Sequence, residues 1–135
     1  MNGHYVFYQP NSHDTRNCVG DCSIRAFCKF FNISWVEAFD WLCEAARTLG
    51  TMPNQIRNIK VVMKMKGHIY HRIGNEPKTV DEFVTVHGGK YMLLVKAKKN
   101  EMHVVTCRNH YYYDTWDSGK AKIVGYWKKG GNAKE

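Results

Sequence analysis

Long hydrophobic runs are missing from the sequence, whose apolar residues come a few at a time between charged and polar ones. A helix that spans a membrane needs about 20 consecutive apolar residues, so we expect no membrane span. The first residues also lack the basic and apolar stretches of a signal peptide, and we expect no export signal. Together these absences favour a cytoplasmic protein.

A sixth cysteine, which would let every thiol pair within the chain, is missing, so the odd number of five argues against a disulfide framework. We therefore expect free thiols in a reducing compartment. Acidic residues are also few, since 12 Asp and Glu face 20 Lys and Arg and leave a net charge of +8. Such a chain attracts anionic partners such as nucleic acid or cell-wall polymer, although charge alone assigns no function.

The chain does hold enough apolar residues to build a core, with 44% hydrophobic and 13% aromatic residues among 135. That composition excludes an intrinsically disordered chain. One core is typical at this length, so we predict a single domain over residues 1–135. Within it we predict a helical part over about 20–67, a sheet part over about 68–127 and a frayed tail over 128–135.

The first predicted helix follows a loop, because Asn, Ser, Asp and Gly crowd residues 11–21. Asp21 supplies a carboxylate that can cap a helix beginning at Cys22 or Ser23. Apolar residues then recur at the spacing of one helical face: Ile24, Phe27, Cys28 and Phe31. The pattern predicts a short amphipathic helix with a cysteine in its first turn.

Two further helices complete the helical part. Ser34 and Glu37 have the Ser-x-x-Glu spacing of a capping box, which opens a helix that ends at Gly50. A third helix is predicted over 53–67, where apolar residues fall on one side and lysines are interleaved.

The second half of the chain is typical of strands, because β-branched and aromatic residues dominate its apolar runs. Strands are predicted over 68–73, 91–95, 103–107, 110–114 and 123–127, besides a short one over 4–8. Thr79 and Glu82 form a capping box for one more short helix, and Arg108 and Asn109 suffice for a tight hairpin. Helices first and an antiparallel sheet after give the α+β class.

Three residues in this pattern can converge on one chemistry. Cys22 lies at a helix start, where the helix dipole favours a thiolate. His103 begins one strand and Asp114 ends the next, so a hairpin places both near one edge of the sheet. In an activated nucleophile of this kind, the imidazole takes the thiol proton and the carboxylate orients the ring.

The segment around Cys22 resembles a known nucleophile segment. Residues 18–27 are Cys-Val-Gly-Asp-Cys-Ser-Ile-Arg-Ala-Phe, and papain-like cysteine peptidases carry Cys-Gly-Ser-Cys-Trp-Ala-Phe with the second cysteine catalytic. Asp114-Thr115-Trp116 resembles their Asn-Ser-Trp segment. The chain is most similar to the compact papain-like domains of bacteriophages and bacteria and to the peptidase domains that trim bacteriocin leaders. The resemblance implies a papain-like fold, in the host cytoplasm if a phage encodes the chain.

Carried over residue by residue, the resemblance implies that Cys22 is the nucleophile, His103 the base and Asp114 the orienting acid. Asp117 lies three residues further on and is the alternative acid. We expect no cofactor.

The same resemblance points to residues around the triad. At the position of the family's oxyanion glutamine stands Arg16, so Asn17, or Gln9 from further back, is the expected oxyanion donor. Independently of the resemblance, Trp35 and Trp116, with Tyr111 to Tyr113, are candidate walls of a substrate pocket.

A metal site is an alternative for the same cysteine. Cys18 and Cys22, with His13 nearby, and the pair Cys107 and His110 offer the thiol and imidazole ligands that zinc prefers. No paired Cys-x2-Cys motif is present, so we predict no metal. The remaining thiols are expected in the core, as small apolar residues: Cys28, Cys43 and Cys107.

The sequence therefore predicts a thiol hydrolase, first of all a peptidase, that acts on a peptide or protein substrate through an acyl-enzyme. The alternative enzyme is a cell-wall amidase or endopeptidase of the CHAP or NlpC kind, because Asp21-Cys22-Ser23 and Met102-His103-Val104 resemble segments of those families. The alternative outside enzymes is a non-catalytic binder of protein or nucleic acid. Its stacking surface for bases would consist of aromatic residues: Trp35, Trp41, Trp116, Trp127 and Tyr111 to Tyr113.

Overall fold

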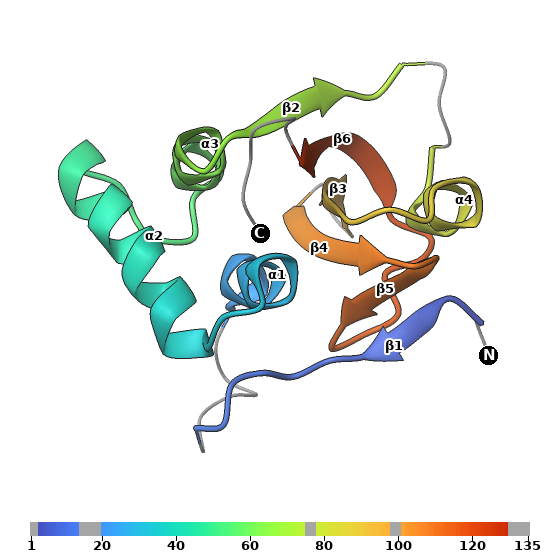
Figure 1. The fold of residues 1–135 in the computed structure, drawn as a ribbon, viewed down its shortest axis with the longest axis horizontal. Coiled ribbons are helices and arrows are strands. Elements are labelled where there is room, and N and C mark those ends of the chain that lie inside the picture. Colours follow the sequence, from blue (N-terminus) through green and yellow to red (C-terminus); the bar gives the residue numbers. More distant parts are fainter. Residues whose placement is uncertain (1–2, 14–19, 75–77, 98–100, 130–135) are drawn as a thin grey trace.

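The structure is a computed structural model that describes residues 3–13, 20–74, 78–97 and 101–129, and it has the predicted α+β class (Figure 1). Its elements are β1 (Tyr5–Phe7), α1 (Cys22–Phe31), α2 (Trp35–Leu49), α3 (Ile56–Met65), β2 (His68–Arg72), α4 (Val80–Val86), β3 (Tyr91–Lys96), β4 (Met102–Arg108), β5 (Tyr111–Asp114) and β6 (Lys122–Lys129). Within these ranges no helix has the length and apolar character to cross a membrane.

The six described strands form one sheet in the order β1-β5-β4-β3-β6-β2. Neighbouring strands are antiparallel except β1, which lies parallel to β5 at one edge. The predicted antiparallel sheet is therefore confirmed for the C-terminal strands β2 to β6, and the short N-terminal strand joins it in parallel. Helices α1 to α3 separate β1 from the other strands along the chain, and such a long connection permits a parallel pair, which a tight turn does not.

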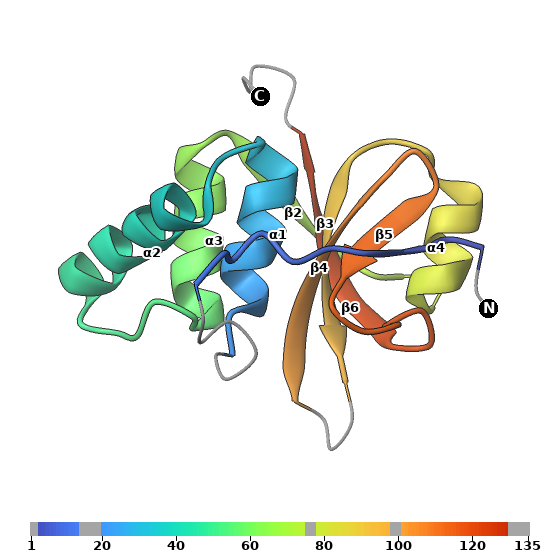
Figure 2. The same cartoon turned by 90° about the horizontal axis from the view of Figure 1, so that it is seen from below.

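Helices cover both faces of the sheet (Figure 2). α1, α2 and α3 lie on one face and α4 on the other, so the central strands are buried from two sides. Side chains along a strand alternate between its faces. In β3, Met92 and Leu94 join the core under α1 to α3, whereas Leu93 and Val95 join the core under α4. The sheet is thus a central layer, and α1 packs on one of its faces.

The predicted helix caps are present before α2 and α4. The Ser34 hydroxyl accepts the backbone N–H of Glu37 at 3.1 Å, and Thr79 and Glu82 form a full capping box. The predicted start of the third helix at Pro53 is wrong, because residues 53 and 54 form a turn and α3 begins after it.

The β4–β5 hairpin brings two of the predicted site residues to one place. It turns at Asn109 and His110, whose φ angles of 54° and 70° suit a two-residue hairpin, so the tight hairpin is confirmed one residue later than predicted. Because β4 and β5 are antiparallel, the start of β4 with His103 and the end of β5 with Asp114 lie at the same end.

The last strand is longer than predicted. β6 continues to Lys129, because β2 pairs with its final residues, and His68 lies opposite Lys129. The predicted tail is therefore wrong for residues 128 and 129, which belong to the sheet. Residues 130–135, the rest of that predicted tail, lie outside the described residues.

One buried hydrogen bond fixes α1 on the sheet. Thr106 Oγ1 of β4 donates to the carbonyl oxygen of Ala26 in α1 at 2.7 Å, and both residues are buried. β4 also carries His103, so this bond sets the position of the helix relative to that histidine.

Replacing Thr106 by Val should lower the free energy of unfolding by about 1 kcal/mol, because a side chain of nearly the same shape can no longer donate to Ala26. Chemical denaturation measures the change. Thr48→Val is the matched control: Thr48 is exposed and bonds to the Glu44 carbonyl of its own helix at 3.1 Å, so its loss should cost less than about 0.5 kcal/mol. Equal losses in the two variants would show that the Thr106 bond does not hold α1.

Candidate active site

The structure brings Cys22, His103 and Asp114 together from three elements. Cys22 is the first residue of α1 and is partly buried, whereas His103 near the start of β4 and Asp114 at the end of β5 are both buried. The imidazole of His103 is hydrogen-bonded to the carboxylate of Asp114 at 2.6 Å and acts on the thiol of Cys22, whose pKa it lowers.

Four described groups donate hydrogen bonds to the carboxylate of Asp114. Its Oδ2 accepts from His103 Nε2 at 2.6 Å and from Ser118 Oγ at 2.8 Å. Its Oδ1 accepts from the backbone N–H of Thr115 at 2.8 Å and from Arg25 Nη2 at 3.3 Å. Burial raises the pKa of Asp114, but the hydrogen bond and charge of His103, with the bonds of Ser118 and Thr115, lower it below its ordinary value. The acid is held ionised and in one orientation.

The imidazole of His103 links the acid to the thiol. Because Nε2 faces Asp114, Nδ1 is the ring nitrogen left for Cys22. The sulfur also has a backbone hydrogen bond to Val104, the next residue of β4. Trp116 lies against the ring of His103, with ring centroids 5.0 Å apart. The histidine is therefore held at Nε2 by Asp114 and covered on one face by Trp116.

The two titrating partners shift each other's pKa in opposite directions. Burial raises the pKa of the Cys22 thiol, but the hydrogen bond and charge of His103, the bond to Val104 and the charge of Arg25 lower it below its ordinary value. Burial lowers the pKa of His103, whereas the hydrogen bonds and charges of Asp114 and Cys22 raise it to about 9. Between the lowered pKa of the thiol and about 9, the pair is a thiolate and an imidazolium. A cysteine nucleophile reacts in this state.

Arg25 is a site residue that sequence reasoning missed. Its guanidinium lies between the carboxylates of Asp21 and Asp114, and all three residues are buried. The predicted helix cap at Asp21 is wrong, because that carboxylate binds Arg25 and the indole N–H of Trp35, the latter at 2.8 Å, and makes no capping bond. The spacing of four residues between Asp21 and Arg25 was a visible signal of a pair, but nothing local pointed to Asp114.

The alternative acid lies elsewhere. Asp117 accepts hydrogen bonds from the Tyr112 hydroxyl and from the backbone N–H of Gly119, the latter at 3.0 Å. These bonds keep its carboxylate within the turn after β5. Of the two acids considered, the structure therefore places Asp114 on His103.

The predicted oxyanion donors are not joined to the thiol by any described contact. The amide oxygen of Gln9 accepts the backbone N–H of Asn11 at 3.1 Å, which engages it within its own segment. Asn17 lies outside the described residues, as does Arg16. The described groups nearest in sequence to the sulfur are the backbone amides in the first turn of α1, whose N–H groups have no partner inside a helix.

The two tryptophans predicted for the pocket flank the site from different sides. Trp116 is 41% exposed and lies on His103. Trp35, the first residue of α2, stacks on Phe39 with ring centroids 5.3 Å apart and donates to Asp21. The wider aromatic surface predicted for base stacking does not form, because Trp127 and Tyr112 are buried in different cores.

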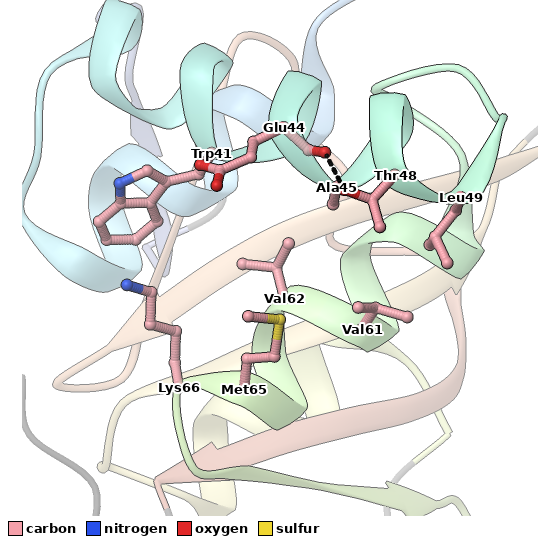
Figure 3. Close-up of a pocket in the computed structure, with 9 residues that line it drawn as sticks. All are labelled: Trp41, Glu44, Ala45, Thr48, Leu49, Val61, Val62, Met65 and Lys66. Atoms are coloured by element: carbon pink, nitrogen blue, oxygen red, sulfur yellow. Dashed lines mark hydrogen bonds between the residues drawn. The ribbon is translucent and has the colours of Figure 1, made fainter.

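Two cavities border other parts of the structure. The first, about 280 Å³, lies between α2 and α3, and its apolar walls end at Lys66, whose Nζ lies 3.9 Å from the ring centroid of Trp41 (Figure 3). The second, about 430 Å³, has Lys60, Lys64 and Tyr70 among its walls. Neither is lined by cysteine, Trp35 or Trp116, so the predicted pocket tryptophans border a different surface.

The other thiols differ from Cys22. Cys28 and Cys107 are buried as predicted, and burial raises the pKa of each to about 12. Cys43 is partly exposed on the flank of α2, so its predicted place in the core is wrong. Cys18, the alternative metal ligand, lies outside the described residues, and within the described ranges no three His, Cys, Asp or Glu side chains are grouped to hold a metal ion.

Comparison with known proteins adds no relative to this geometry. No protein-family model, no curated protein and no solved structure matches the chain. The resemblance to papain-like peptidases therefore stays a prediction from the residues of this chain.

Iodoacetamide should label Cys22 selectively at pH 6. An ordinary thiol is only ~0.3% ionised there, whereas Cys22 has a lowered pKa and Cys28 and Cys107 have pKa values of about 12. Mass spectrometry after labelling across pH 5 to 9 identifies the modified cysteine. In His103→Ala, burial still raises the pKa of Cys22 but no imidazolium lowers it. Labelling of Cys22 at pH 6 should therefore fall by about tenfold or more. Labelling unchanged in that variant would contradict the thiolate–imidazolium pair.

Asp114→Asn should lower the pKa of His103 from about 9 by at least about one unit, because the amide keeps the shape of the acid but removes the charge that favours the imidazolium. Nitrogen NMR of the imidazole over a pH titration gives the value. Asp117→Asn is the control, since that carboxylate binds Tyr112 and Gly119. A drop in Asp117→Asn, with none in Asp114→Asn, would reverse the assignment of the acid.

Proposed function

We propose that the protein is a cysteine-dependent hydrolase, first of all a peptidase, with a papain-like arrangement of Cys22, His103 and Asp114. The observation that carries the proposal is a partly exposed thiol at a helix start whose pKa a buried imidazole lowers, with that imidazole hydrogen-bonded to a buried carboxylate. The order of the three residues along the chain and the position of Trp116 against His103 support it.

In the first half of the reaction, the thiolate of Cys22 attacks the carbonyl carbon of an amide. The tetrahedral intermediate carries a negative charge on its oxygen, which the backbone N–H groups at the start of α1 stabilise. The imidazolium of His103 then gives its proton to the leaving nitrogen as the carbon–nitrogen bond breaks. An amine leaves, and the acyl group stays on sulfur as a thioester.

In the second half, His103 is neutral and acts as a base. Its free nitrogen takes a proton from water, and the hydroxide formed attacks the thioester carbonyl. The carbon–sulfur bond breaks, a carboxylic acid leaves, and the thiolate and imidazolium are restored. Asp114 keeps the ring in one orientation throughout, because Ser118 and Thr115 hold the acid in place.

Charge bears on the choice of substrate. The net charge of +8 supports an acidic peptide, an acidic protein or an anionic polymer as the partner, since opposite charge raises the rate of encounter. For the same reason a cell-wall amidase or endopeptidase is the second candidate. Peptides and the stem peptides of peptidoglycan offer the same amide chemistry, so one assay can contain both.

The wild type should cleave members of a mixture of synthetic peptides and peptidoglycan stem peptides, and acid quenching should trap an acyl group on Cys22. Mass spectrometry detects both products, and the shortened species identifies the substrate class. Cys22→Ala should lose at least about 10³-fold in rate, because the acyl-enzyme cannot form.

Cys43→Ser is the matched control for that loss. Cys43 is a partly exposed thiol away from His103, so the variant should keep the wild-type rate. Cleavage that survives in Cys22→Ala, or neither cleavage nor an acyl adduct in the wild type, would contradict the proposed hydrolase.

A further inference from the structure

Arg25 is the centre of a buried row of alternating charges. It lies in α1, one turn after Cys22, and is 9% exposed. Nη1 binds Oδ1 of Asp21, and Nη2 lies 3.3 Å from Oδ1 of Asp114. With the imidazolium of His103 on the other oxygen of Asp114, negative and positive groups follow one another from Asp21 to the thiolate.

The two carboxylates on Arg25 belong to different parts of the fold. Asp21 directly precedes the helix that carries the nucleophile, and its second oxygen accepts the indole N–H of Trp35. Asp114 ends the strand next to the one that carries His103. Arg25 therefore connects the start of α1 to the acid of the site. A planar guanidinium with two nitrogens can bind two carboxylates at once, which a single ammonium does less well.

Buried charge without a partner is costly, and its field reaches neighbouring groups. Asp21 and Asp114 bring two negative charges near a third, the thiolate of Cys22. Arg25 and His103 bring the two positive charges that oppose them. The site holds its thiolate only while this balance is kept.

We propose that Arg25 is a positioning residue of the Cys22 site, whose guanidinium offsets the buried charge of Asp21 and Asp114 and so allows Cys22 to remain a thiolate. This inference rests on the proposed function, because it assigns Arg25 a role toward the same nucleophile. Arg25 acts through the field around the sulfur and through the acid that orients His103, and not by contact with substrate.

The sign of each substitution follows from the charges around Arg25. The titratable groups that the described contacts and electrostatic interactions connect to Arg25 and its two carboxylates include Asp21, Asp114, Cys22, Cys28, His103 and Tyr5. Tyr5 and Cys28 stay neutral near pH 6, because burial raises the pKa of both. Removing Arg25 leaves excess negative charge and disfavours the thiolate, whereas removing the charge of Asp21 leaves excess positive charge and favours it.

The test is the midpoint of the acid limb of iodoacetamide labelling at Cys22, measured from pH 4 to 9 by mass spectrometry on the full chain. Arg25→Gln should move the midpoint up by about one pH unit, and Asp21→Asn should move it down. The double variant Asp21→Asn with Arg25→Gln should return at least halfway to the wild type. Arg25→Lys, which keeps the charge, should stay closer to the wild type than Arg25→Gln.

A purely structural role gives a different result. If Arg25 serves only packing, Arg25→Gln lowers thermal stability and leaves the midpoint unchanged, which overturns the inference. A midpoint that moves in Arg25→Gln and does not return in the double variant also overturns it, because the shift then follows from displaced groups and not from charge. If Arg25→Gln does not fold, Asp21→Asn decides by itself, and a midpoint that stays or rises in that variant overturns the inference.

The readout also separates this inference from the proposed function. Labelling of Cys22 needs no substrate. A wild type whose Cys22 does not label selectively at low pH contradicts the proposed hydrolase itself. If the wild type labels selectively and cleaves peptide, but the labelling midpoint is the same in the Arg25 and Asp21 variants, only the role of Arg25 is overturned.

Discussion

A buried carboxylate must have its negative charge met by donors, and Asp114, at 2% exposure, imposes this requirement on the structure. Its donors come from α1, from β4 and from the turn after β5, as Arg25, His103, Ser118 and Thr115. None of these elements can shift by itself without leaving a carboxylate oxygen or a charged donor unmatched. Cys22 lies one turn before Arg25 on the same helix, so its place beside His103 follows from the same requirement.

The thiols of this chain show that burial and reactivity are separate variables. Cys28 lies on the same helix as Cys22, yet burial raises its pKa to about 12. Burial acts in the same direction on Cys22, and only the imidazole, a backbone bond and Arg25 reverse it. Partial exposure then makes the sulfur reachable. The helix start contributes the position, and the hairpin β4–β5 contributes the groups that change the chemistry.

Local patterns in the sequence predicted the local structure. Hydroxyl and acid at capping-box spacing gave the starts of α2 and α4, and a run of aromatic and β-branched residues gave β3. The proximity of Cys22, His103 and Asp114 was also foreseen, because a hairpin and a helix start are local features. The bridge from Arg25 to Asp114 joins residues 89 positions apart in the sequence, and no spacing rule encodes it. The parallel pairing of β1 with β5 was missed for the same reason.

The pairing of β1 with β5 bears on when, during synthesis, the site can assemble. Its Tyr5 hydroxyl and the backbone N–H of Tyr8 both bond to the carbonyl of Asp114, so the first part of the chain clamps the last residue of β5. During synthesis Cys22 leaves the ribosome long before His103 and Asp114 do. Until then the thiol has neither its imidazole nor its acid. Cys22 therefore gains its imidazole and its acid only after β4 and β5 have been synthesised and have folded.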